Sequence, residues 1–173
     1  MTPYTIVIDT REQLGYQFAA PFTGPRKVQL AVQTIVCGLP TGDYSLLGFE
    51  SQIAIERKSL SDLYSTLGQG RARFTRELER LAAMEFAAVV VEAEWSEILG
   101  NPPSRSELNP KTVLCSVVAW QQRYPRIHWW TVPGRSVGEA VTIRLLDRFW
   151  RERESSASKE QVWTPEEILA REG

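Results

Sequence analysis

The chain has 173 residues, of which 43% are hydrophobic and 24% charged, as in an ordinary globular domain and unlike a wholly disordered protein. Its formal net charge is −1, so a nucleic-acid partner would have to be bound by a local basic patch. One histidine and two cysteines argue against a zinc site and a disulfide framework, which leaves carboxylates, lysine and arginine for any catalysis.

In the first half of the chain, the pattern predicts strands separated by turns. Residues 4–9 and 28–36 are rich in β-branched side chains and are each expected to form a strand. Further strands are expected at 43–47 and 52–58. The continuous apolar run at 86–91 is typical of a strand that is covered on both faces.

Helical signals alternate with these strands. Ser59 and Asp62 form a capping box before a leucine stripe, and a second helix is expected over residues 71–84. Asn109 and Pro110 are typical of the N-cap and first position of a third helix. A strand at 127–132 precedes a helix that opens with the capping box of Ser136 and ends near residue 153. This alternation predicts an α/β layered domain with a mixed sheet.

Three charged residues share a spacing that points to phosphodiester hydrolysis. Glu56 and Lys58 are two apart in a predicted strand, so they share a face about 7 Å apart. Asp43 begins the preceding strand and is expected to lie beside Glu56. Two carboxylates close together repel each other unless a cation lies between them, and Mg²⁺ prefers such oxygen ligands. Alone, this D-x12-E-x-K pattern has many chance matches.

The residues around this pattern resemble a known family. Gly42-Asp43-Tyr44 followed by Glu56-Arg57-Lys58 and Asp62 matches the signature G-D-x(n)-E-R-K-x-x-x-D of the XPF/Hef family of structure-specific endonucleases. The segment Ile8–Glu12 resembles the acidic segment that precedes this signature. The resemblance covers about residues 4–149. It implies a restriction-endonuclease-like fold of the PD-(D/E)xK superfamily, with a central mixed β-sheet flanked by helices on both faces.

The resemblance also implies roles for the site residues. Asp43, Glu56 and Asp9 would be the metal ligands for Mg²⁺ or Mn²⁺, and Lys58 would act on the attacking water and the phosphate. Arg57 and Asp62 match positions that support catalysis, whereas Glu12 is expected to be peripheral. The residues expected to contact DNA phosphates are Arg71, Arg73, Arg76 and Arg11.

Two departures from the family pattern concern DNA binding. The family places an arginine and, four residues later, a glutamine on the helix after the signature. Here the pairs are Arg71 with Thr75 or Arg73 with Glu77, and neither has the glutamine. The arginines of 71–80 could equally be an exposed helix face. In addition, no helix-hairpin-helix or helicase domain is expected in the sequence.

These observations predict a magnesium-dependent DNA endonuclease that cuts flaps, forks or other branched DNA in repair or recombination. The alternatives are a non-catalytic DNA-binding or dimerisation module of the same fold, a restriction-like junction resolvase, or an exonuclease. A homodimer is expected through an apolar stripe from Val137 to Phe149.

The expected division of the chain is a nuclease domain at 1–154, followed at 155–173 by a partly flexible linker and a short helix at 164–169. No apolar run approaches the 18 residues or so of a membrane span, and no signal-peptide core is seen. An intracellular location is therefore expected, cytoplasmic or, in a eukaryote, nuclear.

Overall fold

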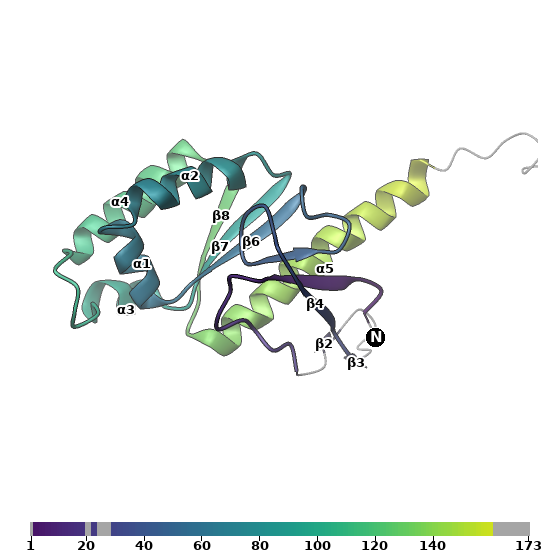
Figure 1. Ribbon diagram of the computed structural model, residues 1–173, viewed down its shortest axis with the longest axis horizontal. Helices are drawn as coiled ribbons and strands as arrows, with labels where there is room; N and C mark the ends of the chain where they lie inside the picture. Colours follow the sequence, from purple (N-terminus) through teal and green to yellow (C-terminus); the bar gives the residue numbers. More distant parts are fainter. Residues whose placement is uncertain (1, 20–21, 24–28, 161–173) are drawn as a thin grey trace, which may run out of the picture.

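The computed structural model describes residues 2–19, 22–23 and 29–160 (Figure 1). The strands are β1 (Thr5–Asp9), β2 (Phe22–Thr23), β3 (Gln29–Leu30), β4 (Gln33–Cys37), β5 (Tyr44–Leu46), β6 (Ile53–Lys58), β7 (Phe86–Val91) and β8 (Ile127–Thr131). The helices are α1 (Leu60–Leu67), α2 (Arg71–Ala82), α3 (Trp95–Gly100), α4 (Pro110–Arg123) and α5 (Arg135–Glu160).

The main sheet is mixed and has six strands in the order β4-β1-β5-β6-β7-β8. β5 is antiparallel to both of its neighbours, β1 and β6, whereas β1 with β4 and β6 with β7 and β8 run parallel. Because β5 runs against β1 and β6, its first residues lie beside the last residues of β1 and β6. Asp9, Asp43 and Lys58 are therefore brought to one edge of the sheet.

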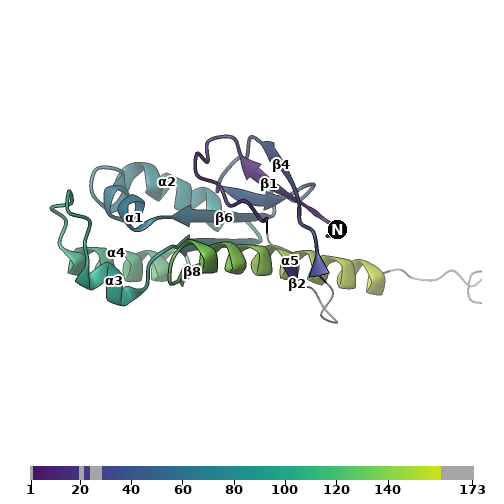
Figure 2. The same cartoon turned by 90° about the horizontal axis from the view of Figure 1, so that it is seen from below.

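Each face of the sheet has its own apolar core. Ala54, Ala87 and Val89 pack with α1, α2 and α4, whereas Ile55 and Val90 pack with α5. This alternation along β6 and β7 is what a strand covered on both faces requires. Figure 2 shows α5 running along the side of the sheet away from α1 and α2. The predicted mixed α/β fold with helices on both faces is confirmed.

Local signals predicted several element boundaries correctly. The Ser59–Asp62 capping box is present at the start of α1, and the Asn109 side chain caps α4 with Pro110 in its first turn. β7 has the predicted bounds. These signals succeed because each depends on contacts within about one turn of the chain.

Other boundaries differ from the sequence prediction. The strand expected at 28–36 is divided, because β3 pairs with β2 in a small second sheet, whereas β4 pairs with β1. Helix α3 was not predicted, since six residues are too few to show a helical period. α5 extends to Glu160, into residues expected to be linker. The helix expected at 164–169 lies outside the described residues.

The apolar stripe expected to mediate dimerisation is largely used within the chain. Ile143, Leu146 and Phe149 lie in the core beneath the sheet, and Val137 is among the exposed apolar residues. A homodimer therefore stays a prediction. Among the described helices, none combines the length and hydropathy that a membrane span would need.

Candidate active site

The centre of the site is the carboxyl end of β6. Glu56 and Lys58 are 4% and 8% exposed, and their side chains form an ion pair on the face covered by α1 and α2. The Lys58 ammonium lies 4.6 Å from the ring centroid of Phe74, which α2 contributes. Strand alternation thus places the two charged groups together, and Phe74 covers the lysine.

Asp43 is held against β6 by main-chain hydrogen bonds. The Asp43 amide donates to the Ile55 carbonyl at 2.8 Å, and Asp43 Oδ2 accepts from the Arg57 amide at 2.7 Å. The preceding residue, Gly42, has φ +74°, and a Cβ at that position would lie 3.0 Å from the Ala54 side chain. Glycine is therefore required for both the backbone conformation and the close approach to β6.

The site disfavours the ionised forms of Asp43 and Glu56 unless a cation neutralises them. Burial, with a further contribution from the charge of Glu12, raises the pKa of Asp43 to about 7. Burial and the charge of Asp43 raise the pKa of Glu56 well above its usual range. For Lys58, burial alone would lower the pKa, but the neighbouring Glu56 outweighs it, so the lysine pKa is raised and its ammonium stays protonated. Such a pair of hard oxygen donors suits Mg²⁺ or Mn²⁺.

Asp9 lies at the same edge but is already fully hydrogen-bonded. It is 1% exposed; its Oδ1 accepts from the Arg11 amide and Nε, and its Oδ2 accepts from Arg11 Nη2 and the Leu39 amide. Burial alone would raise the pKa of Asp9, but these hydrogen bonds lower it. Within the described residues, no group of three or more His, Cys, Asp or Glu side chains is arranged to hold a metal ion. The structure thus brings Asp43 and Glu56 together, with Asp9 engaged beside them.

Arg11 and Glu12 both lie beside the acidic residues at the end of β1. The Arg11 guanidinium binds Asp9 and the Leu39 carbonyl, although its side chain is 66% exposed. Glu12 is not remote from the site, because Glu12 Oε1 lies 3.5 Å from Arg57 Nη1 and its charge contributes to the raised pKa of Asp43. Arg57 itself points to the face of the sheet opposite Glu56 and Lys58, as strand alternation predicts.

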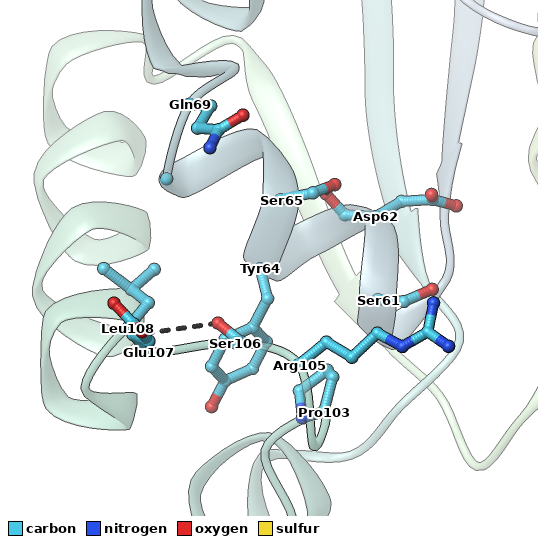
Figure 3. Close-up of a pocket in the computed structure, with 11 residues that line it drawn as sticks. Ser61, Asp62, Tyr64, Ser65, Gln69, Pro103, Arg105, Ser106, Glu107 and Leu108 are labelled. Carbon is cyan, nitrogen blue, oxygen red and sulfur yellow. Dashed lines mark hydrogen bonds between the residues drawn. The ribbon is translucent and has the colours of Figure 1, made fainter.

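Asp62 caps the N-terminus of α1. Its side chain accepts from Ser59 Oγ at 2.6 Å. It also lines a surface pocket of about 890 Å³ between α1 and the loop that precedes α4 (Figure 3). In that view Asp62, Ser61 and Ser65 lie along α1, and Arg105 extends from the loop that precedes α4. Asp43, Glu56 and Lys58 do not line this pocket.

The arginines of α2 face two different sides. Arg71 donates to Ser116 Oγ at 2.8 Å and stacks over the Trp120 ring, so it is bound to α4. Arg73, Arg76 and Arg80 are exposed. Arg73 and Arg80 lie on the side of α2 that Glu77 occupies, since residues three and four apart on a helix are neighbours, and Arg76 lies next to Arg73 and Arg80 by the same spacing.

Glu77 is a further neighbour of the site, although the family signature does not include it. Its charge raises the pKa values of Asp43, Glu56 and Lys58, so this half-buried carboxylate faces the acidic pair from α2. In the sequence, the position of Glu77 near the site is indicated by its spacing of three residues from the buried Phe74, which places the two on adjacent parts of one helix face. Arg73 and Arg80, four residues before and three after Glu77, therefore border the site.

Comparison with known proteins identifies the family and the fold. The family model described as the ERCC4 domain matches residues 8–140. Among solved structures, XPF from Aeropyrum pernix is similar, with a TM-score of 0.56 and 24% identity over 84% of this chain and 60% of that chain. XPF from Aeropyrum pernix in complex with DNA is similar with a TM-score of 0.57 and 24% identity, over 87% of this chain and 66% of that chain.

This chain thus spans less than two thirds of those solved chains. Comparison with curated protein sequences finds no match. The solved structures support the fold, and the family model spans the acidic segment, the Gly-Asp-Tyr turn and the Glu-Arg-Lys strand. The chain belongs to the ERCC4 domain family and has the fold of the XPF structures.

Proposed function

We propose that this domain is a metal-dependent DNA endonuclease that hydrolyses phosphodiester bonds in flaps, forks or other branched DNA. The observation that carries the proposal is the pair of half-buried Asp43 and buried Glu56, whose charges oppose each other, beside a protonated Lys58 at one edge of the sheet. A DNA partner is supported by the relative from Aeropyrum pernix whose structure is a complex with DNA.

Asp43 and Glu56 would hold the Mg²⁺ or Mn²⁺ ion. When bound, such an ion neutralises charge on the scissile phosphate and acidifies water. Lys58, kept protonated by Glu56, is suited to donate a hydrogen bond to a phosphate oxygen as negative charge develops there. A protonated lysine is not a general base, so its role is electrostatic rather than proton abstraction.

The remaining groups at the strand ends have supporting roles. Arg11 and the Leu39 amide hold Asp9, which fixes the end of β1 beside Asp43. Arg73, Arg76 and Arg80 offer phosphate contacts along the exposed side of α2 that borders the site. Phosphates held there would pass close to Asp43 and Glu56.

The proposal is tested with labelled flap, fork, splayed-arm, four-way and linear duplex DNA. We expect cleavage of a branched substrate in Mg²⁺ or Mn²⁺ and its loss in EDTA, with 5′-phosphate and 3′-hydroxyl ends. Full activity in EDTA would refute the metal dependence. Equal cleavage of linear duplex would refute the preference for branched DNA, and cleavage only from ends would identify an exonuclease.

The surface formed by Arg73, Arg76 and Arg80 makes a separate prediction about binding. Replacing Arg73 and Arg80 together by alanine should weaken DNA binding and reduce the slope of log K against log salt by about 1–2, because phosphate contacts release counterions. The control is Arg148→Ala, an exposed arginine that pairs with Glu152 on α5. Salt titration by fluorescence anisotropy measures both, and equal slopes for the two variants would exclude this side of α2 from the interface.

A further inference from the structure

A second ionic cluster lies on the opposite face of the strand end that carries the site. Glu92 directly follows β7, and its amide donates to the Lys58 carbonyl at 2.8 Å, which ties the ends of β6 and β7 together. Its carboxylate accepts two hydrogen bonds from Arg57, from Nε to Oε1 and from Nη2 to Oε2, both at 2.7 Å. The two side chains are only 7% and 8% exposed. This is a buried, bidentate ion pair.

Residues from two other segments close around this pair. Arg135, at the start of α5, places Nη1 3.7 Å from Glu92 Oε1 and donates from Nη2 to the Gly15 carbonyl at 2.6 Å. The Tyr16 ring has Arg57 at 5.7 Å and Arg135 at 5.0 Å from its centroid. The Glu92–Arg57 pair is therefore packed between the loop after β1, the ends of β6 and β7, and α5.

Helix α5 is shaped to accept this packing. A Cβ at Gly138 would lie 2.3 Å from the Tyr16 hydroxyl oxygen and 3.5 Å from Glu92 Cγ. Any larger residue at position 138 would displace Tyr16. The glycine therefore permits the close approach of α5 to the cluster.

The cluster is connected to the proposed cation site through one main-chain group. The Arg57 amide, on the residue whose guanidinium Glu92 binds, donates to Asp43 Oδ2 at 2.7 Å. Glu56 and Lys58 flank Arg57 in β6 and point to the other face. A bidentate guanidinium–carboxylate pair fixes orientation as well as distance. Fixing Arg57 thus constrains the amide that holds Asp43 and the two residues that carry Glu56 and Lys58.

We propose that Glu92 is a positioning residue for the cation site: by binding Arg57 on the far face of β6, it keeps Asp43 and Glu56 at the spacing at which they bind a divalent ion. This inference rests on the proposed function for its effect on cleavage, whereas its effect on cation binding can be measured without DNA. Groups that orient ligands without touching the metal typically change metal affinity or activity about 10–100-fold when they are removed.

The test compares Glu92→Gln with Asp147→Asn. Asp147 is the control because it is also a buried carboxylate that binds an arginine, Arg151, bidentately. It lies away from the site, where it accepts a hydrogen bond from Tyr4, the residue just before β1. We expect both variants to melt at lower temperature. Only Glu92→Gln should weaken Mn²⁺ binding, by about 10-fold or more, as measured by calorimetry on the protein without DNA. The same variant should lower kcat by about 10-fold or more and leave KM for DNA unchanged.

Two further variants keep the test decisive if Glu92→Gln does not fold. Arg57→Lys retains the charge and the main-chain amide but loses the bidentate geometry, so it should weaken Mn²⁺ binding similarly. Glu92→Asp retains the carboxylate and should recover part of the affinity.

Lower melting temperatures with unchanged Mn²⁺ affinity and kcat would overturn the inference. A wild-type chain that binds Mn²⁺ through Glu92-dependent geometry but cleaves no DNA would refute the proposed function and leave this inference standing. A wild-type chain that binds no Mn²⁺ would refute both.

Discussion

Asp43→Asn is expected to abolish cleavage while stabilising the folded chain. Asparagine keeps an oxygen that can accept the hydrogen bond from the Arg57 amide, so the turn is preserved. The variant loses one of the two negative charges available for the cation, for which we expect a loss of about 10³-fold or more in kcat/KM, or about 4 kcal/mol of transition-state stabilisation. Single-turnover cleavage measures this loss, and Glu79→Gln, an exposed carboxylate on α2, is the control.

The gain in stability follows from the raised pKa of Asp43. Because burial raises the pKa of Asp43 from 3.8 to about 7 in the folded state, the folded chain binds a proton more tightly than the unfolded chain between those values. The free energy of unfolding of the wild type therefore falls as pH rises from about 4 to about 7. Asp43→Asn removes this decrease and also the repulsion on Glu56.

At pH 8 in EDTA, we expect Asp43→Asn to melt about 2–8 °C above the wild type, which corresponds to about 1–2 kcal/mol. At pH 4 the difference should be small. Mg²⁺ should raise the melting temperature of the wild type more than that of the variant, because a bound ligand stabilises only the state that binds it. A variant that melts below the wild type at pH 8 would show that the carboxylates do not repel each other in the folded chain.

Lys58→Met should also slow cleavage strongly, but with the opposite effect on stability. Methionine fills similar space beside Phe74 without the ammonium group, so the loss should be in kcat rather than in DNA affinity. We expect a loss of about 10²–10³-fold from removing one donor to the developing charge. Single-turnover rates measure the effect on kcat, and DNA binding in Ca²⁺ measures the effect on DNA affinity.

Removing Lys58 leaves Glu56 buried beside Asp43 without its cationic partner. Breaking a buried ion pair by deleting one partner is strongly destabilising, about 3–5 kcal/mol, because the remaining charge is uncompensated. Part of this loss should be recovered by lowering the pH, which protonates Glu56. Combining Lys58→Met with Asp43→Asn should restore stability but not cleavage. A Lys58→Met chain with wild-type kcat would exclude the lysine from the reaction.

The sequence determined those features that depend on neighbours along the chain. The capping box at Ser59 and the proline at the start of α4 need only contacts within one helical turn. The shared face of Glu56 and Lys58 follows from strand alternation alone, and the family resemblance followed from the residues around them.

Only the tertiary structure decided how the polar groups at the strand ends are paired. Asp9 is bound by Arg11 and, across 30 residues, by Leu39, whereas Arg57 is bound by Glu92 across 35 residues. Glu77 lies near the site because α2 packs over the sheet. Arg71 is directed away from the site because it stacks over Trp120 of α4. Residue type and spacing set the face on which a side chain lies. Which acid pairs with which arginine depends on how the strands and helices pack. The sequence therefore defined the chemistry available at this edge, and the fold decided which carboxylates lie together without an arginine partner.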